Sequence, residues 1–282
     1  MGCNVEGPGD GGVPGSPPGG TTGGTALCCT CPADGDVSTN GNTEYVPTTW
    51  RAASYSRLNK CHIDIQRTTS GGTVTITKKF KLSYAAGATA ASDAATVTSA
   101  INSAMTSWQS AASGHKIKIE QPTCDPQELT IRFVSSIVTS GEDVSVSVDG
   151  TAAPTPPAAG LRSAVSHGTD MTFYLNGVGN VSWTMIHETG HTFGLSDEYT
   201  YNRTSATPAP SLTYKAADDP DQTVTLTTST IPVATGNFGF DKATVMGKNG
   251  NTTYPKYLFH WIAIEVQNIL AANATPASVY VT

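Results

Sequence analysis

Hydrophobic and polar residues alternate along several short stretches of the chain, and this period of two residues predicts β-strands. Residues 73–84 (TVTITKKFKLSY) form the longest such stretch and are rich in β-branched and aromatic side chains, as expected of a strand with one buried face. Shorter strands are predicted at residues 115–120, 129–134, 144–148, 171–175 and 224–226. Together these segments predict a β-sheet of several strands.

Apolar residues three or four positions apart predict helices elsewhere. Residues 92–112 form one such helix, with Ser92 or Asp93 as the expected N-cap and a buried face made of Val97, Ile101, Ala104, Met105 and Trp108. Residues 254–269 (YPKYLFHWIAIEVQNI) predict a final helix with Pro255 near its first turn. Strands and helices in this mixture predict an α+β fold.

A further helix carries the most distinctive chemistry of the chain, within the run HETGHTFGLSDEY at residues 187–199. His187 and His191 are four residues apart, so a helix places them on one face, one turn above the other. Glu188 follows the first histidine, where it can act as a general base toward a water activated by the metal. The apolar side of the same helix is predicted from the 3, 4, 3 spacing of Trp183, Ile186, Gly190 and Phe193.

The residues after this HExxH pattern predict a third metal ligand. Gly194 is expected to end the helix, because glycine adopts the left-handed C′ conformation at little steric cost. The chain then turns back, and Asp197 is the expected third ligand to Zn²⁺. Glu198 competes for that position and is otherwise expected to bond the backbone or the free N–H of a ligand histidine. Three protein ligands with an open fourth position are typical of a catalytic zinc site.

These residues resemble the metzincin metalloendopeptidases, whose zinc signature is HExxHxxGxx(H/D) followed by a methionine turn. The segment ATVMG at residues 243–247 is similar to that turn. The motif is also similar to that of the immunoglobulin-A-peptidase-like bacterial metallopeptidases, and an aspartate as third ligand resembles the snapalysin type. The resemblance implies a twisted mixed sheet with a backing helix and an active-site helix, then an irregular C-terminal subdomain with the Met-turn and final helix. It also implies that Met246 forms a hydrophobic floor beneath the zinc.

Composition predicts the organisation of the chain. Residues 1–42 are rich in glycine and proline and are expected to be a disordered tether. Residues 43–282 are expected to form one catalytic domain, with an N-terminal subdomain at about 43–194 and a C-terminal subdomain at about 195–282. The even number of cysteines suggests disulfides, although a metal cluster or a lipid-anchored Cys3 are alternatives; the six are Cys3, Cys28, Cys29, Cys31, Cys61 and Cys124.

Charge and hydropathy narrow the partners and the location. The net charge of −6 argues against nucleic acid, because no basic surface would neutralise phosphates. No apolar run approaches the roughly 20 residues needed to cross a membrane. The low charge content and abundance of Gly, Ser, Thr and Ala are common in secreted bacterial proteins, so an extracellular or surface-attached protein is expected, although no signal peptide is visible. A calcium site or a solvated acidic turn is predicted at Asp218, Asp219 and Asp221.

The sequence therefore predicts a secreted zinc-dependent endopeptidase that acts on a protein or peptide substrate. One alternative is a threonine-rich surface or adhesion domain with a degenerate metal site. Another is a zinc hydrolase with a non-peptide substrate, because the water chemistry would be identical. No residue pattern identifies the substrate-binding positions.

Overall fold

The computed structural model describes fourteen segments of the chain, which are residues 36–45, 59–69, 71–122, 124–152, 163–166, 168–176, 180–195, 197–201, 211–215, 223–227, 238–240, 244–247, 250–272 and 277–282. Within these segments the protein combines a large mixed sheet with few helices, which agrees with the predicted α+β class. No helix of the described part is long and apolar enough to cross a membrane. Asp218, Asp219 and Asp221, where either a calcium site or a solvated acidic turn was predicted, lie outside the described residues.

The large sheet has nine strands, β1 (Asp36–Tyr45), β2 (Asn59–Thr68), β3 (Gly71–Tyr84), β4 (Lys116–Glu120), β5 (Gln127–Ile137), β6 (Val144–Ala152), β7 (Ala164–Ser166), β8 (Asp170–Asn176) and β13 (Ser278–Val281). Its order is β13-β4-β5-β3-β6-β8-β7, with β2 beside the first half of β3 and β1 beside β2. The pairs β3–β5, β3–β6 and β6–β8 are parallel, and the other pairs are antiparallel. Mixed pairing in the sheet is thus confirmed.

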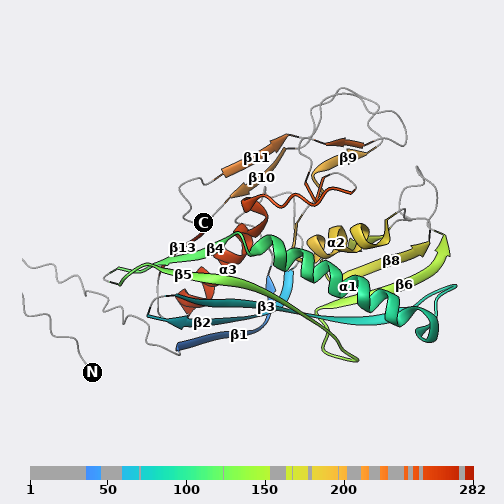
Figure 1. Cartoon of the computed structure of the whole chain (residues 1–282), viewed down its shortest axis with the longest axis horizontal. Helices are drawn as coiled ribbons and strands as arrows, with labels where there is room; N and C mark the ends of the chain where they lie inside the picture. The colour runs from blue at the N-terminus through green and yellow to red at the C-terminus, as the bar shows by residue number, and fades with distance from the viewer. Residues whose placement is uncertain are drawn as a thin grey trace, which may run out of the picture.

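Three α-helices are described, α1 (Ala90–Ala112), α2 (Val181–Thr192) and α3 (His260–Ala272), the last preceded by the 3₁₀ turn η1 (Lys256–Phe259). In Figure 1, α1 crosses the sheet with α2 beside it. Two small antiparallel pairs complete the described elements. They are β9 (Tyr199–Tyr201) with β12 (Phe238–Phe240), and β10 (Ser211–Lys215) with β11 (Thr223–Thr227).

The core forms between the helices and one face of the sheet. Val74, Ile76 and Phe80 of β3 are fully buried, as the alternating pattern predicts. At the centre, the Trp108 ring of α1 meets the Phe193 ring edge-on, with centroids 5.3 Å apart. The Trp108 indole N–H donates to the carbonyl of residue 186 in α2 at 3.1 Å. This packing fixes α2 against α1 and the sheet.

The start of α1 differs from the predicted one. Thr89, not Ser92 or Asp93, is the N-cap, and its hydroxyl accepts a hydrogen bond from the Ser92 backbone N–H at 3.2 Å. The Asp93 carboxylate accepts from the Thr89 backbone N–H at 2.7 Å in return. The two predicted residues therefore lie within the first turn, where their side chains take part in a reciprocal cap.

Strand pairing also changes the predicted boundaries. β1 begins at Asp36 and pairs with β2, so residues 36–42 belong to the sheet rather than to the tether. β13 pairs with β4, which joins the end of the chain to the sheet of the expected N-terminal subdomain. Cys124 is disulfide-bonded, which agrees with the expectation of disulfides. Cys61 is a buried free thiol.

Glu265 in α3 supports a prediction about pH and stability. Its side chain is 2% exposed, and burial raises its pKa from 4.5 to about 7. Between pH 4.5 and 7 the Glu265 carboxyl of the folded protein therefore holds a proton that the unfolded chain has released. The contribution of this group to stability is therefore most favourable below pH 4.5 and becomes less favourable as pH rises to 7. At roughly 1.4 kcal/mol per pH unit, we expect this group to remove about 3 kcal/mol of unfolding free energy across that window.

Urea unfolding at pH 4.5 and pH 7 measures this effect. Glu265→Gln, which has no proton to lose, is expected to lack the Glu265 part of the loss, so that the variant gains stability over the wild type as pH rises. Equal pH slopes in the two proteins would show that Glu265 ionises normally. Glu128→Gln is the control, because Glu128 is exposed on β5.

Candidate metal centre

The helix that carries the HExxH residues begins and ends at specific local signals. Asn180 is the N-cap of α2, and its side-chain oxygen accepts from the Trp183 backbone N–H at 2.9 Å. At the other end Gly194 has φ 81°, the left-handed conformation predicted for it. The backbone N–H groups of Gly194 and Leu195 donate to the carbonyls of His191 and Gly190 at 2.9 and 3.2 Å. This pair of bonds is a Schellman motif, and the predicted helix end is confirmed.

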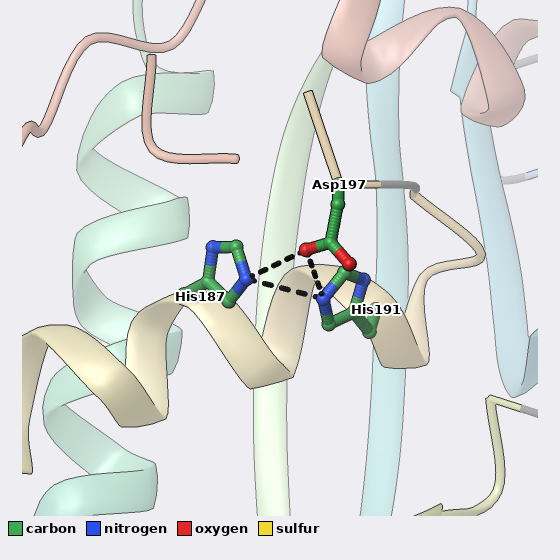
Figure 2. Close-up of side chains that lie close together, drawn as sticks. All are labelled: His187, His191 and Asp197. Atoms are coloured by element: carbon green, nitrogen blue, oxygen red, sulfur yellow. Dashed lines mark hydrogen bonds and ion pairs between the residues drawn. The ribbon is translucent and has the colours of Figure 1, made fainter. Parts of the chain in front are cut away.

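The three predicted metal ligands, His187 and His191 on this helix and Asp197 just after it, converge beside the helix (Figure 2). His187 Nε2 and His191 Nε2 are 3.1 Å apart. Asp197 Oδ1 lies 3.1 Å from each of these nitrogens. The turn at Gly194 brings the aspartate back over the two imidazoles, so one carboxylate oxygen and two ring nitrogens form a nearly equilateral triangle.

The hydrogen bonds of the two Nδ1 atoms determine the protonation of the two Nε2 atoms. His187 Nδ1 lies 2.9 Å from the Val245 carbonyl oxygen, and His191 Nδ1 lies 2.8 Å from that of Leu195. A carbonyl oxygen can only accept, so each Nδ1 carries the proton, and Nε2 of a neutral ring presents a lone pair. Two lone pairs and a carboxylate oxygen at 3.1 Å repel one another unless a proton or a metal cation lies among them.

The donor set and its spacing fit Zn²⁺. Zinc binds histidine nitrogen and carboxylate oxygen at about 2.0–2.2 Å with tetrahedral geometry, which separates neighbouring ligand atoms by roughly 3.3 Å. The observed 3.1 Å separations are close to that value. Histidines that bind metal usually donate their other ring N–H to a carbonyl or carboxylate, as both do here. His187, His191 and Asp197 are therefore the residues that would hold the ion.

Burial and charge prepare the site for a cation. The side chains of His187 and His191 are 5% and 4% exposed, whereas that of Asp197 is 32% exposed. Burial opposes ionisation of Asp197, but the neighbouring His191 and His187 outweigh it and hold the pKa of Asp197 well below its usual range. Burial likewise opposes a charged His187, yet hydrogen bonding and charge from Asp197 raise its pKa. The site is thus buried on the helix side and open to solvent beside the aspartate.

Glu188, the predicted general base, is 5% exposed in α2. It lies directly after His187, and its negative charge also raises the pKa of that histidine. Among the tyrosines after the site, Tyr257 donates to Glu198 at 3.3 Å and Tyr254 pairs with the Ser107 hydroxyl at 2.6 Å.

The predicted methionine turn lies against the helix. Val245 and Met246 are fully buried, and the Met246 carbonyl accepts from the Glu198 backbone N–H at 2.9 Å. The Glu198 carboxylate accepts hydrogen bonds from the Thr244 hydroxyl and from Tyr257. The Nδ1–H groups of His187 and His191 donate to main-chain carbonyls, so these ring protons do not go to Glu198, which was one of the two roles expected for it. Glu198 instead bonds to Thr244 and Met246 in the turn whose Val245 carbonyl accepts from His187.

Gly190 explains how closely that turn approaches the helix. A Cβ at this position would lie 2.4 Å from Met246 Sδ and 2.9 Å from the Trp108 ring. Alanine is favoured over glycine within a helix by about 1 kcal/mol, but overpacking a core costs about 1–3 kcal/mol. The difference between these two effects leads us to expect that Gly190→Ala lowers the unfolding free energy by up to about 2 kcal/mol, measured by urea denaturation of the metal-free protein.

A compensating variant identifies the contact responsible. In a Met246→Ala background, Gly190→Ala is expected to cost less, because the sulfur that the new methyl group meets has been removed. If Gly190→Ala stabilises the protein in both backgrounds, the helix and the turn are not packed as described.

Two supporting contacts were missed by the sequence predictions. Lys78 is fully buried in β3 and donates from Nζ to the Thr192 carbonyl at the end of α2 at 2.7 Å. Burial lowers its pKa to about 8, and the negative end of the helix dipole stabilises the charge that remains. The sequence could have indicated this contact, because Lys78 occupies a position of the alternating strand pattern that faces the core. The second contact is the stack of the Trp183 ring on the His187 ring. Trp183 was predicted on the apolar side of the helix, but it is only half-buried and covers a histidine instead. The four-residue spacing of Trp183 and His187 was the signal for this contact.

No protein-family model matches this chain, and no curated protein is significantly similar to it. The chemistry of the metal centre is accordingly inferred from its own residues and their arrangement.

Proposed function

We propose that the protein is a secreted zinc-dependent endopeptidase of the metzincin type. The observation that carries the proposal is the triangle of His187 Nε2, His191 Nε2 and Asp197 Oδ1. Both Nδ1–H groups donate hydrogen bonds to backbone carbonyls. This arrangement, beside the buried Glu188, supports a hydrolytic centre rather than an isolated structural ion, because a structural zinc has four protein ligands.

The residues of the site have separate roles in the proposed peptide hydrolysis. His187, His191 and Asp197 would hold the zinc, and a bound Zn²⁺ would polarise the peptide carbonyl and make a nearby water more acidic. Glu188 accepts the proton of the attacking water and passes it to the leaving amine. The partly exposed Asp197 lies on the solvent side of the site, which gives an extended substrate access from that direction.

Several features support the metzincin type. The helix α2 ends at a left-handed Gly194, and Asp197 follows three residues later. Met246 lies buried against Gly190 of the same helix, which supports the similarity of its segment to a methionine turn. The mixed sheet with α1 packed beside α2 agrees with the order of elements expected for that family.

Zinc analysis and a digestion assay test the proposal. We expect about one zinc per chain, cleavage of casein and of a peptide library, loss of cleavage with a chelator, and recovery on adding Zn²⁺. Zinc binding without peptide cleavage would favour a surface domain with a degenerate site or a hydrolase of other substrates. Absence of both binding and cleavage would exclude a zinc enzyme.

A further inference from the structure

Trp183 is a residue for which the proposed mechanism has no role, although it touches a metal ligand. It lies one helical turn before His187 in α2, and its half-buried indole stacks on the imidazole with centroids 4.9 Å apart and planes at 25°. The backbone N–H of Trp183 is held by the Asn180 cap at 2.9 Å. The indole therefore starts from a fixed point of the helix and covers one face of the ligand ring.

The same indole also belongs to a closed circuit of contacts. The circuit includes the segment whose Val245 carbonyl accepts from His187 Nδ1. Its Nε1–H donates to the Asn251 carbonyl at 2.8 Å, and the Asn251 side-chain oxygen accepts from the Thr253 N–H at 2.7 Å. The Thr253 carbonyl accepts from the Val245 N–H at 3.0 Å. The Val245 carbonyl accepts from His187 Nδ1 at 2.9 Å, so the chain of contacts returns to the ring on which Trp183 stacks.

This circuit of contacts controls both rotations of the His187 side chain. The stacked indole restricts the plane of the imidazole, and the Val245 carbonyl sets the direction of Nδ1 within that plane. Because the indole N–H of Trp183 donates to the Asn251 carbonyl, the indole also helps to hold the segment that supplies the Val245 carbonyl. We propose that Trp183 is a positioning residue that keeps His187 Nε2 aimed at the metal. The proposal rests on the metal centre of the proposed function and does not depend on the substrate.

Zinc affinity and the tautomer of His187 test this role. Supporting residues around metal ligands typically change metal affinity by roughly 10–100-fold. We expect the zinc Kd, measured by chelator competition, to rise by about that factor in Trp183→Leu, which loses both stacking and the N–H. Trp183→Phe keeps an aromatic face and loses only the hydrogen bond, so its Kd should rise less. Asn251→Ala, which removes the bond to Thr253 without touching the helix, should resemble Trp183→Phe.

The second measurement uses the metal-free protein. Long-range ¹H–¹⁵N spectra of the histidine rings should show the Nδ1–H tautomer for His187 in the wild type and a mixture of tautomers in Trp183→Leu. Ser182→Ala, at an exposed position beside Trp183, is the control and should change neither quantity. Circular dichroism establishes that each variant is folded, and Asn251→Ala decides the question if Trp183→Leu is not.

Unchanged zinc affinity and an unchanged His187 tautomer in the folded variants would overturn the positioning role. That result is distinguishable from failure of the proposed function, in which the wild type itself cleaves no peptide. The tautomer is measured without metal or substrate, so it tests the positioning role even then.

Discussion

Replacing Glu188 with glutamine is expected to leave zinc bound and to lower kcat/KM for peptide cleavage by roughly 10²–10⁴-fold. The amide has nearly the shape of the carboxylate but cannot accept a proton from the attacking water. Glu188 is not one of the three converging metal-ligand residues, so its substitution should not remove the ion. Metal analysis and steady-state kinetics on the same preparation measure the two effects together.

The exposed Glu128 of β5 supplies the matched control, since Glu128→Gln makes the same chemical change far from the metal ligands in the sequence. It should retain both zinc and wild-type kinetics. If Glu188→Gln cleaves peptide as fast as the wild type, another group is the general base. If it loses zinc instead, Glu188 contributes to the metal centre itself.

Asp197→Ala is expected to lose zinc, because it removes the only charged member of the triangle, whose Oδ1 lies 3.1 Å from both histidine nitrogens. The loss of affinity should exceed the roughly 10–100-fold typical of a residue that only supports a ligand. Zinc content after dialysis and competition with a chelator measure it. The variant should stay folded, because Asp197 is partly exposed.

Glu198→Ala is the informative neighbour, since the two acidic residues are adjacent in the sequence and differ in surroundings. Glu198 is fully buried and accepts hydrogen bonds from Thr244 and Tyr257. Its removal takes away the acceptor of the buried Thr244 hydroxyl, at a cost of about 1–3 kcal/mol, so we expect a lower unfolding free energy and weakened but detectable zinc binding. Full zinc in Asp197→Ala together with complete loss in Glu198→Ala would reverse these assignments.

The sequence identified the parts of the candidate metal centre that local geometry determines. Histidines four residues apart share a helix face whatever the rest of the fold, and Gly194 adopts the positive φ that ends α2. The turn that follows is short, so Asp197 could be placed from the motif alone. The alternating pattern of residues 73–84 likewise predicted β3 and its buried face, because strand periodicity is a local property.

The remaining features depend on contacts between residues far apart in the chain. β2 was not predicted, although Cys61, Ile63 and Ile65 alternate, and its place is set by pairing with β3. The final strand pairs with β4 across more than half of the chain. Such pairings minimise exposed backbone groups over the whole sheet, so no single segment reveals them.

The same distinction applies within the site. The sequence by itself determined which atoms approach one another at the metal centre, because a helix turn and a glycine bend suffice to bring them together. Only the tertiary structure decided what holds those atoms. The Val245 carbonyl on His187 and the Trp183 bond to Asn251 join segments separated by 58 and 68 residues. Their partners are backbone carbonyls, which every residue possesses, so no residue type marks them before the chain has folded.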